Sequence, residues 1–342
     1  MNSSTLSILI DPASEHYSGN KLFDLSDLAL NRDGTLLPFY RLKALLNSKN
    51  IDINTADLIF NQNIQPKSKR YFSLGMLRNI PLAKDEGVIF KAFLIMEPPI
   101  VAPELYDALP VLTSLFEEVY VHNVSGDGYS LAGVNQSKLR KLYWPQPYWG
   151  ALDQFWSRVD RLNRVVVING NHKPKTLNQE LYSKRIKAMV GLSKFNVIDL
   201  YGRGWRRWWA RSSFWTPYWF NRRVLMSIYK GECVSKYEIL SKYSYCLCFE
   251  NMEMKGYVSE KIFDCLYAGT IPIYWGAPDI EFLVPPDVFI DARKFSTWDE
   301  MWTSISSMSS DDISRIRHAG RLYLESENFM KHYHSLEYIV DR

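Results

Sequence analysis

Residues 245–276 constrain the fold of this 342-residue chain strongly, because their hydrophobic pattern changes period twice. Residues 245–249 are apolar and β-prone, and a polar loop that ends in a glycine follows them. After Ser259 the apolar side chains recur at helical spacing, until Gly269 stands where a helix C-terminal glycine belongs. Residues 270–275 are again a short apolar run. The stretch therefore predicts a strand, a helix and a second strand parallel to the first.

The polar side chains of this stretch gather at the end of the first predicted strand and the start of the helix. Ligands bind at that place in an open α/β sheet, because the helix N-terminus offers free N–H groups and the positive end of a dipole. A lysine in the first turn disfavours the helix by itself, so an anion such as a diphosphate is the expected ligand. A solvated first turn is the alternative. The side chains are Glu250, Asn251, Tyr257, Glu260 and Lys261.

Three motifs in this region resemble the donor-site signature of the α1,3-fucosyltransferases of glycosyltransferase family 10. They are F-E-N at residues 249–251, Y-V-S-E-K at residues 257–261 and I-P-I-Y-W-G at residues 271–276. The family reads F-E-N, a loop, Y-V-T-E-K, a helix, and I-P-[IV]-Y/V-x-G. Ser259 stands where the family has threonine and keeps the hydroxyl. The resemblance covers about residues 236–291 and is specific.

The resemblance implies an α/β protein with the GT-B fold, in which two Rossmann-like domains face each other across a cleft. The alternation of strand-like and helix-like segments along the chain also indicates an α/β class. We expect an N-terminal acceptor-binding domain over residues 1–155 and a C-terminal domain that binds GDP-fucose over residues 156–325. Residues 326–342 are expected to form a C-terminal helix that packs back on the N-terminal domain.

A carboxylate follows the apolar strand predicted over residues 88–96. This strand stops at Glu97 and two prolines. Residue type alone leaves two interpretations, in which Glu97 caps a helix predicted over residues 104–116 or is a rigidly held functional carboxylate. The family places its general base, a glutamate, after the matching strand, so the resemblance implies that role for Glu97.

A second set of polar residues opens the C-terminal domain. Residues 164–169 predict a buried strand, which a turn containing Asn171 and a helix over about residues 177–190 follow. In the family the matching helix carries an arginine that contacts the donor diphosphate. The resemblance therefore implies that Arg185 and the Asn171 turn belong to the donor site, and a planar guanidinium suits a diphosphate.

Composition and charge weigh against several classes of protein. The net charge of +4 does not indicate a nucleic-acid-binding protein, which presents a concentrated basic face. Aromatic residues reach 14%, which suits stacking on sugars, although large cores also use them. The cysteines lack a second cysteine or histidine pair at zinc spacing, so we expect buried free thiols and no metal site. They are Cys233, Cys246, Cys248 and Cys265.

The sequence shows no signal-peptide pattern and no window that approaches the ~20 apolar residues of a membrane span. Animal members of the family carry a membrane anchor, so we expect this chain to be a cytoplasmic, bacterial-type enzyme.

Residues 205–223 mix tryptophans with arginines and match no part of the family pattern. They predict either peripheral contact with the inner face of a membrane or a domain-capping insertion whose tryptophans join the core.

The resemblance implies a fucosyltransferase that moves L-fucose from GDP-β-L-fucose to an acceptor oligosaccharide by an inverting displacement. No metal or other cofactor is expected. The expected product is an α1,3 linkage to GlcNAc of a lactosamine-type end, in protein glycosylation or lipopolysaccharide biosynthesis. Arg185 and Lys261 would hold the diphosphate, Glu260 and Asn251 sugar or ribose hydroxyls, and Tyr257 would lie along the nucleotide. Two alternatives stay open: a GT-B transferase with another sugar nucleotide, and a non-catalytic sugar-nucleotide-binding protein.

Overall fold

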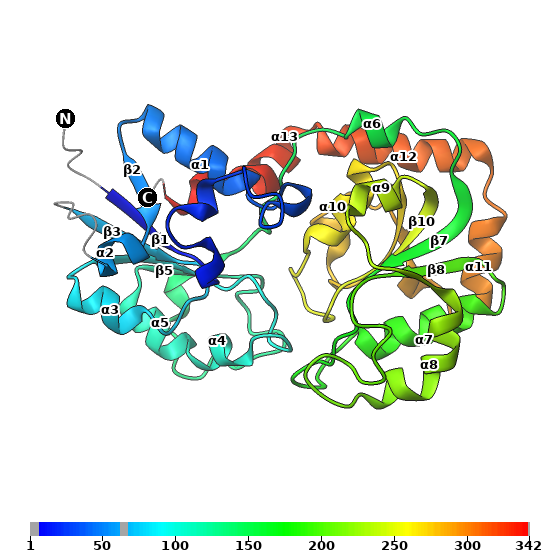
Figure 1. Ribbon diagram of the computed structural model, residues 1–342, viewed down its shortest axis with the longest axis horizontal. Coiled ribbons are helices and arrows are strands. Elements are labelled where there is room, and N and C mark those ends of the chain that lie inside the picture. Colours follow the sequence, from blue (N-terminus) through cyan, green and yellow to red (C-terminus); the bar gives the residue numbers. More distant parts are fainter. Residues whose placement is uncertain (1–6, 62–67, 341–342) are drawn as a thin grey trace. The chain divides into compact units, whose positions relative to one another are not determined.

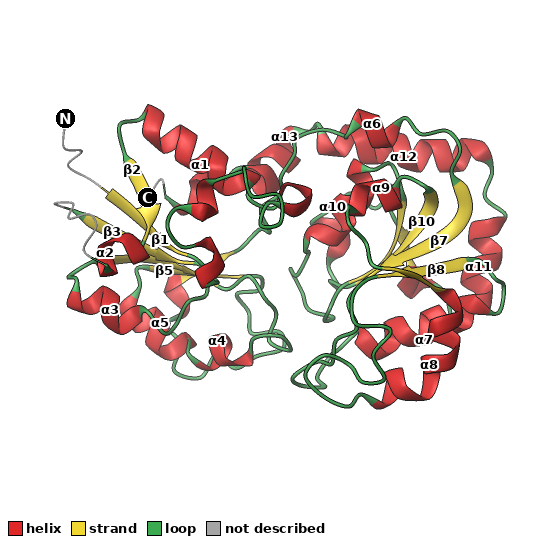
Figure 2. Ribbon diagram, in the orientation of Figure 1, coloured by secondary structure: helices red, strands yellow, loops and turns green. Residues whose placement is uncertain are grey.

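The computed structural model describes residues 7–61 and 68–340, and the chain forms two compact units. The first unit is Met1–Tyr148 together with Lys331–Arg342, and the second is Trp149–Met330. Each unit is a parallel β-sheet with helices on both of its faces (Figures 1 and 2). Two parallel α/β units are what the expected fold class requires.

The first sheet has six parallel strands in the order β2-β1-β3-β4-β5-β6. Ile8 and Ile10 pack into one buried cluster and Leu9 into another, because successive side chains of a strand point to opposite faces. The sheet is thus buried on both faces, which explains the continuous apolar runs. Its strands are β1 Ser7–Asp11, β2 Asp52–Thr55, β3 Lys69–Ser73, β4 Ile89–Leu94, β5 Glu118–Val121 and β6 Leu139–Lys141. Its helices are α1 Leu37–Ser48, α2 Asp57–Phe60, α3 Ile80–Asp85, α4 Pro103–Asp107 and α5 Leu109–Leu115.

Two elements of the first unit differ from what the sequence predicts. Residues 62–70 are polar and basic, which predicts a surface loop, but residues 69 and 70 begin β3, and residues 62–67 lie outside the described part of the chain. The helix predicted over residues 104–116 is divided into α4 and α5. Pro110 causes the division, because proline lacks the N–H of a continuous helix and its ring clashes with the carbonyl four residues earlier.

The second sheet also has six parallel strands, in the order β12-β11-β10-β7-β8-β9. This is the order of dinucleotide-binding folds, and the strand order reverses between β7 and β10. The predicted unit over residues 245–276 is confirmed as β10, α10 and β11. The strands are β7 Leu162–Ile168, β8 Ile198–Tyr201, β9 Tyr229–Gly231, β10 Tyr243–Phe249, β11 Ile271–Trp275 and β12 Ile290–Asp291. The helices are α6 Asp153–Trp156, α7 Tyr182–Ser193, α8 Thr216–Ile228, α9 Lys236–Leu240, α10 Glu260–Tyr267, α11 Trp298–Ser306, α12 Ser310–Leu324 and α13 Glu327–Phe329.

Helix α10 ends at the glycine that the sequence indicated. Gly269 has φ of +69°, a left-handed conformation that glycine adopts without a Cβ penalty. Its N–H donates to the Leu266 carbonyl at 3.1 Å, and the Thr270 N–H donates to the Cys265 carbonyl at 2.9 Å. These two bonds form a Schellman motif, which satisfies the last carbonyls of the helix and turns the chain into β11.

The C-terminal segment differs in form from the single helix that was expected. After α13 the chain has a short π-helical turn at Met330–His334 and a 3-10 turn at Glu337–Ile339. The Ser335 hydroxyl accepts the Glu337 N–H at 3.2 Å, and such local side-chain bonds compete with a continuing helix. Leu336 and Ile339 lie in a buried cluster of the first unit. The structure changes unit after residues 148 and 330, where the sequence suggested 155 and 325.

Candidate functional site

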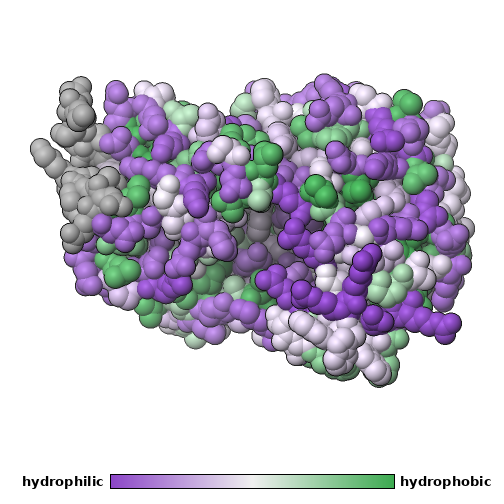
Figure 3. All heavy atoms as spheres, in the orientation of Figure 1, coloured by the Kyte–Doolittle hydropathy of each residue, from purple (hydrophilic) through white to green (hydrophobic). Residues whose placement is uncertain are grey.

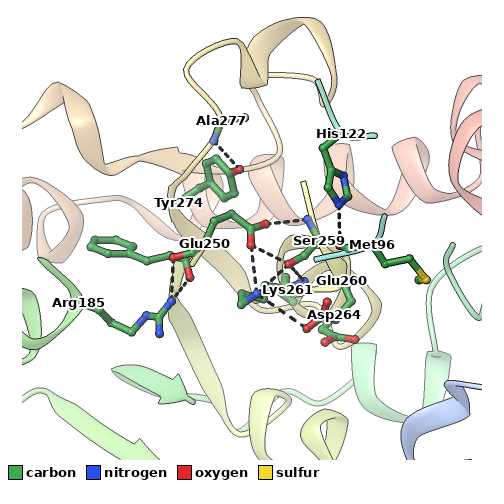
Figure 4. Close-up of polar contacts among 12 residues, drawn as sticks. Met96, His122, Arg185, Glu250, Ser259, Glu260, Lys261, Asp264, Tyr274 and Ala277 are labelled. Carbon is green, nitrogen blue, oxygen red and sulfur yellow. Dashed lines mark hydrogen bonds and ion pairs between the residues drawn. The ribbon is translucent and has the colours of Figure 1, made fainter. Parts of the chain in front are cut away.

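A buried carboxylate organises the junction between β10 and α10. Glu250 directly follows β10 and its side chain has no exposed surface. Its carboxylate accepts hydrogen bonds from the Ser259 N–H at 2.8 Å, the Ser259 hydroxyl at 2.7 Å and the Lys261 ammonium at 3.1 Å (Figure 4). Charged hydrogen bonds of this kind are what keeps a buried carboxylate stable. Glu250 therefore connects the strand end to the first turn of α10.

The first turn of α10 fixes the position of a positive charge. Ser259 is the N-cap residue, and its Oγ also accepts a hydrogen bond from the Lys261 ammonium at 2.9 Å. Burial alone would lower the pKa of Lys261, but the carboxylates of Glu250 and Glu260 outweigh burial and raise this pKa. Lys261 is therefore a protonated, rigidly held cation beside the positive end of a helix dipole.

A cavity of about 240 Å³ opens beside this turn, at the point where the strand order reverses between β7 and β10. Glu260 lies on the wall of this cavity. Burial would raise the pKa of its carboxyl group, but the positive charges of Lys261 and Lys236 outweigh burial and hold this pKa below its usual value. Lys236 also pairs with Asp264 at 2.5 Å. The wall thus alternates fixed positive and negative charge. It consists of Ile168, Asn169, Gly170, Lys236, Leu240, Cys246, Leu247, Cys248, Glu260, Lys261, Asp264 and Cys265.

Arg185 of α7 lies behind the β10–α10 junction and does not form part of that wall. It is only 3% exposed, and its Nη2 donates to the carbonyls of Phe249 at 2.7 Å and Glu250 at 2.8 Å (Figure 4). Within the described residues its Nε has no hydrogen-bond partner. Burial lowers the pKa of Arg185. A buried guanidinium that bonds to carbonyls keeps its positive charge next to the strand end.

Three other predicted site residues lie around the same junction without lining the cavity. Asn171 is 2% exposed and donates to the Gly204 carbonyl at 3.4 Å, while its Oδ1 has no partner among the described residues. Tyr257 is buried in the loop before α10. Asn251 is half-buried, and its carbonyl accepts the Leu181 N–H at 3.0 Å. Of the predicted donor residues, only Glu260 and Lys261 line the cavity.

Several features of this site were not predicted from the sequence. Glu250 was placed at the strand end, but nothing in its local pattern indicated that it neutralises Lys261. Lys236 and Asp264 lie 28 positions apart and meet only because α9 packs beside α10. Asn169 ends β7, and the strand order alone brings it to the cavity. The available signal was the rule that carboxyl ends of strands meet at the reversal point of the sheet.

The last glycine of the I-P-I-Y-W-G motif has a packing reason. A Cβ on Gly276 would lie 2.3 Å from the Tyr274 hydroxyl and 2.5 Å from Cγ of Glu250. The Tyr274 hydroxyl accepts the Ala277 N–H at 3.0 Å, so it is held in place (Figure 4). Only glycine leaves room for the buried Glu250 side chain.

The first unit places Glu97 three residues beyond β4, where its carbonyl accepts the Tyr106 hydroxyl at 3.0 Å. Glu97 is half-buried and does not cap a helix, because α4 starts at Pro103 with Ala102 as its N-cap residue.

His122, another polar residue at a strand end, is fully buried with Nε2 2.7 Å from the Met96 carbonyl. Burial lowers the pKa of His122 to about 3, so its imidazole is neutral near pH 7.

The described part of the chain has no group of three or more His, Cys, Asp or Glu side chains that could bind a metal ion. All four cysteines are buried free thiols, as expected. Burial raises the pKa of Cys248 and Cys265, so these thiols are protonated and unreactive near neutral pH.

Comparison with known proteins agrees with this geometry. Residues 171–319 match the family model "Glycosyltransferase family 10 (fucosyltransferase) C-term". The chain is 46% identical over 66 residues to the alpha-(1,3)-fucosyltransferase FucT of Helicobacter pylori, which covers 19% of this chain and 14% of that protein. It is 35% identical over 75 residues to the alpha-(1,4)-fucosyltransferase of Arabidopsis thaliana, or 22% of this chain and 19% of that protein. The chain thus matches less than a fifth of each relative's length.

A crystal structure of an alpha1,3-fucosyltransferase with GDP has the same fold. It aligns with a TM-score of 0.50 and 15% identity over 94% of this chain and 84% of that chain. The family match includes Asn171, Arg185, Glu250 and the whole first turn of α10. Residues 171–319, within the second unit, are thus similar to the C-terminal part of glycosyltransferase family 10.

Proposed function

We propose that this protein is a fucosyltransferase that moves L-fucose from GDP-β-L-fucose to a hydroxyl of an acceptor glycan, with inversion at the anomeric carbon. One observation carries the proposal. The ammonium of Lys261 is held by Glu250 and Ser259 at the N-terminus of α10, beside a cavity at the reversal point of the second sheet. A nucleoside diphosphate binds at such a point in related α/β folds.

The leaving group explains the positive charges. The diphosphate gains negative charge as the bond to fucose breaks, and fixed cations stabilise that charge without reorganising. Lys261 and the free N–H groups of α10 supply this stabilisation from the cavity wall. Arg185 would act from behind the strand end, where its buried charge and its unpartnered Nε favour an anion nearby. No step of this scheme needs a metal ion.

Glu260 is the group on the cavity wall that suits the hydroxyls of a sugar or ribose. Its carboxylate is one-third exposed and stays charged, so it accepts hydrogen bonds from hydroxyl groups. Asn251, Tyr257 and Asn171 surround the same strand end and would bind the rest of the nucleotide after small side-chain movements.

Glu97 is proposed as the general base that takes the proton from the acceptor hydroxyl. Support comes from its place after β4, where Pro98 and Pro99 restrict the backbone and the side chain is half-buried. We propose GlcNAc of a lactosamine-type end as the acceptor, with an α1,3 linkage. The matched relatives include enzymes named for α1,3 and for α1,4 transfer. Linkage analysis of the reaction product therefore tests the proposed α1,3 bond.

The decisive experiment measures GDP release from GDP-fucose by the purified protein in EDTA, with and without N-acetyllactosamine. Release that increases with the acceptor is expected, and it would establish the donor, the acceptor class and metal independence together. Slow release that the acceptor does not change would retain the donor and redirect the search to other glycans. Release from UDP- or GDP-linked hexoses but not from GDP-fucose would replace the proposed donor. No binding of any sugar nucleotide would refute the proposal.

A further inference from the structure

The second unit contains a stretch of aromatic and basic residues that the proposed reaction does not use. We call residues 203–223 the Trp/Arg segment; they run from the end of β8 into α8. The segment is divided in the structure. Trp205, Trp215 and Tyr218 are buried, whereas a second group of rings is exposed: Trp208, Trp209, Phe214, Trp219 and Phe220.

The buried members hold the segment firmly on the sheet. The Trp205 ring N–H donates to the Asn169 carbonyl at 2.6 Å, at the end of β7. The Tyr218 hydroxyl, from α8, bonds the carbonyls of Trp205 and Arg207. Gly202 allows this close approach, because a Cβ there would lie 1.9 Å from the Asn169 carbonyl oxygen. The exposed rings therefore project from an ordered base.

The exposed rings are grouped. Phe214 and Trp219 have ring centroids 5.7 Å apart, and Trp219 and Phe220 lie at 5.3 Å. Phe220 is 76% exposed and Trp208 is 64% exposed, which is unusual for side chains of this size. Figure 3 shows pale and green residues together at the lower end of the second unit, where Figure 1 places α8. Large exposed apolar groups of this kind mark an interaction surface.

The charged side chains of the segment itself are all positive. Residues 200–231 contain no aspartate or glutamate. A hollow of about 420 Å³ has three exposed arginines and Tyr229 on its wall, and one of these arginines, Arg207, lies over the Trp209 ring with its Cζ 5.3 Å from the ring centroid. Glu232, the acidic residue on that wall, pairs with Arg203 at 3.6 Å. The three arginines are Arg203, Arg206 and Arg207. Guanidinium groups bind phosphate oxygens through two parallel hydrogen bonds.

We propose that the Trp/Arg segment is a docking surface for a bilayer that contains anionic phospholipid. Tryptophan rings bind at the headgroup level, and neighbouring arginines, such as Arg207 beside Trp209, pair with lipid phosphates. The hollow between Arg203, Arg206 and Arg207 accommodates one such phosphate group. None of the helices within residues 7–61 and 68–340 is long and apolar enough to cross a membrane.

Other partners fit this surface less well. A second copy of the chain would bring the same arginines against each other in a two-fold interface, which like charges oppose. Single-stranded nucleic acid stacks on free aromatic faces, but the Trp219 ring contacts the rings of both Phe214 and Phe220. The proposal does not depend on the proposed fucosyl transfer, because the exposed rings and the hollow lie outside the cavity beside Lys261.

The test is flotation of the purified full chain with vesicles of phosphatidylcholine alone or with about 30% phosphatidylserine. We expect the chain to float with the anionic vesicles at ~50 mM salt and to dissociate at ~500 mM. The variants Trp219→Ser/Phe220→Ser and Arg206→Glu/Arg207→Glu should each reduce binding by more than about tenfold. GDP at saturation should not release the bound protein.

Matched controls make this result specific. Phe282→Ser removes an equally exposed ring of the same unit, outside the segment. Lys242→Glu/Lys294→Glu changes the net charge as much as the arginine variant does, at exposed positions elsewhere. Both controls should float like the wild type, and circular dichroism checks that all variants are folded. The proposal fails if the wild type does not bind anionic vesicles, if both segment variants bind normally, or if GDP displaces the protein. Equal losses in the controls, self-association through the segment, or tighter binding to single-stranded RNA would also refute it.

Discussion

At the scale of single residues, the site depends on a buried pair of opposite charges. Glu250 is wholly buried, and Lys261 is its nearest cation at 3.1 Å. Removing one member of such a pair leaves an uncompensated buried charge, which is strongly destabilising. The pair therefore positions Lys261 and makes it hard to replace without a structural cost.

We predict that Lys261→Ala lowers kcat/KM for GDP-fucose by two to three orders of magnitude, because the leaving diphosphate loses its fixed cation. The free energy of unfolding should fall by about 3 kcal/mol, since Glu250 is left unpaired. The double variant Glu250→Gln/Lys261→Ala removes both charges, so it should recover part of the stability and stay inactive. Lys242→Ala, at an exposed position, serves as the control. An active double variant would contradict the role of Lys261.

A second buried carboxylate lies in the first unit. Asp11 ends β1 and is 2% exposed, with hydrogen bonds from the Tyr71 hydroxyl at 2.5 Å and Asn79 at 3.0 Å. Burial raises the pKa of Asp11 from the ordinary 3.8 to about 6, although both hydrogen bonds favour the charged form. The folded protein therefore keeps a proton on Asp11 at pH values where the unfolded chain has lost it.

This difference predicts a pH dependence of stability. Between about pH 4 and pH 6 the folded state binds more protons than the unfolded state at Asp11, so the free energy of unfolding should fall as the pH rises. The total effect is at most about 3 kcal/mol at 1.36 kcal/mol per pH unit. Asp11→Asn cannot ionise and should flatten this part of the curve, so its stability relative to wild type increases toward pH 7. Urea unfolding of both proteins at a series of pH values measures the free energy of unfolding. Parallel curves of stability against pH for wild type and Asp11→Asn would contradict the raised pKa of Asp11.

At the scale of elements, helix α10 is specified at both ends by local signals. Ser259 caps its N-terminus, and Gly269 closes its C-terminus with a Schellman motif. The same serine hydroxyl donates to Glu250, so the cap of the helix is also a contact of the buried charge pair. The Ser259 side chain thus contributes both to the helix cap and to the buried charge pair.

Ser259→Ala is expected to lower the free energy of unfolding by about 2 kcal/mol, because it removes the cap and one donor to a buried carboxylate. Donor affinity should also weaken, since the Lys261 ammonium loses one acceptor at 2.9 Å. Ser259→Thr keeps the hydroxyl and should lose much less. Urea unfolding and GDP titration calorimetry of the two variants provide the comparison, and equal effects of Ala and Thr would show that the hydroxyl does not matter.

At the scale of the whole molecule, the proposed donor residues and the proposed base belong to different units. Lys261 and Arg185, the proposed diphosphate ligands, lie in the second unit, and Glu97 lies in the first. Donor binding and acceptor activation should therefore respond to different substitutions. This division does not depend on the exact placement of Asn251 or Tyr257.

Glu97→Gln should reduce kcat by about two to four orders of magnitude, because the acceptor hydroxyl loses its general base. GDP affinity should not change, since Glu97 is outside the unit that would bind GDP. Single-turnover transfer and GDP titration calorimetry check the two parts separately. Glu104→Gln, an exposed glutamate in α4, is the matched control. Transfer at the wild-type rate by Glu97→Gln would disprove the assignment.

The sequence by itself determined the elements whose signals are local. The period change after Ser259, the glycine at 269 and the apolar runs on either side sufficed to predict β10, α10 and β11, because capping and periodicity act within a few residues. They also placed Glu260 and Lys261 at a helix N-terminus, and so predicted an anion site there. Pro110 is also a local signal, because it indicates a break in a helix, but the helix predicted over residues 104–116 ran through it.

Only the tertiary structure decided which charged side chains pair with each other, and which side chains are buried or exposed. Arg185 bonds carbonyls 64 and 65 positions away, and Lys236 reaches Asp264 across two helices. In the Trp/Arg segment the same residue type is buried at 205 and 215 and exposed at 208 and 219. These outcomes follow from the strand order, which brings distant segments to one edge of the sheet. Hydrophobic periodicity reports the environment of a residue along its own element, and it contains no information about which distant element packs against it.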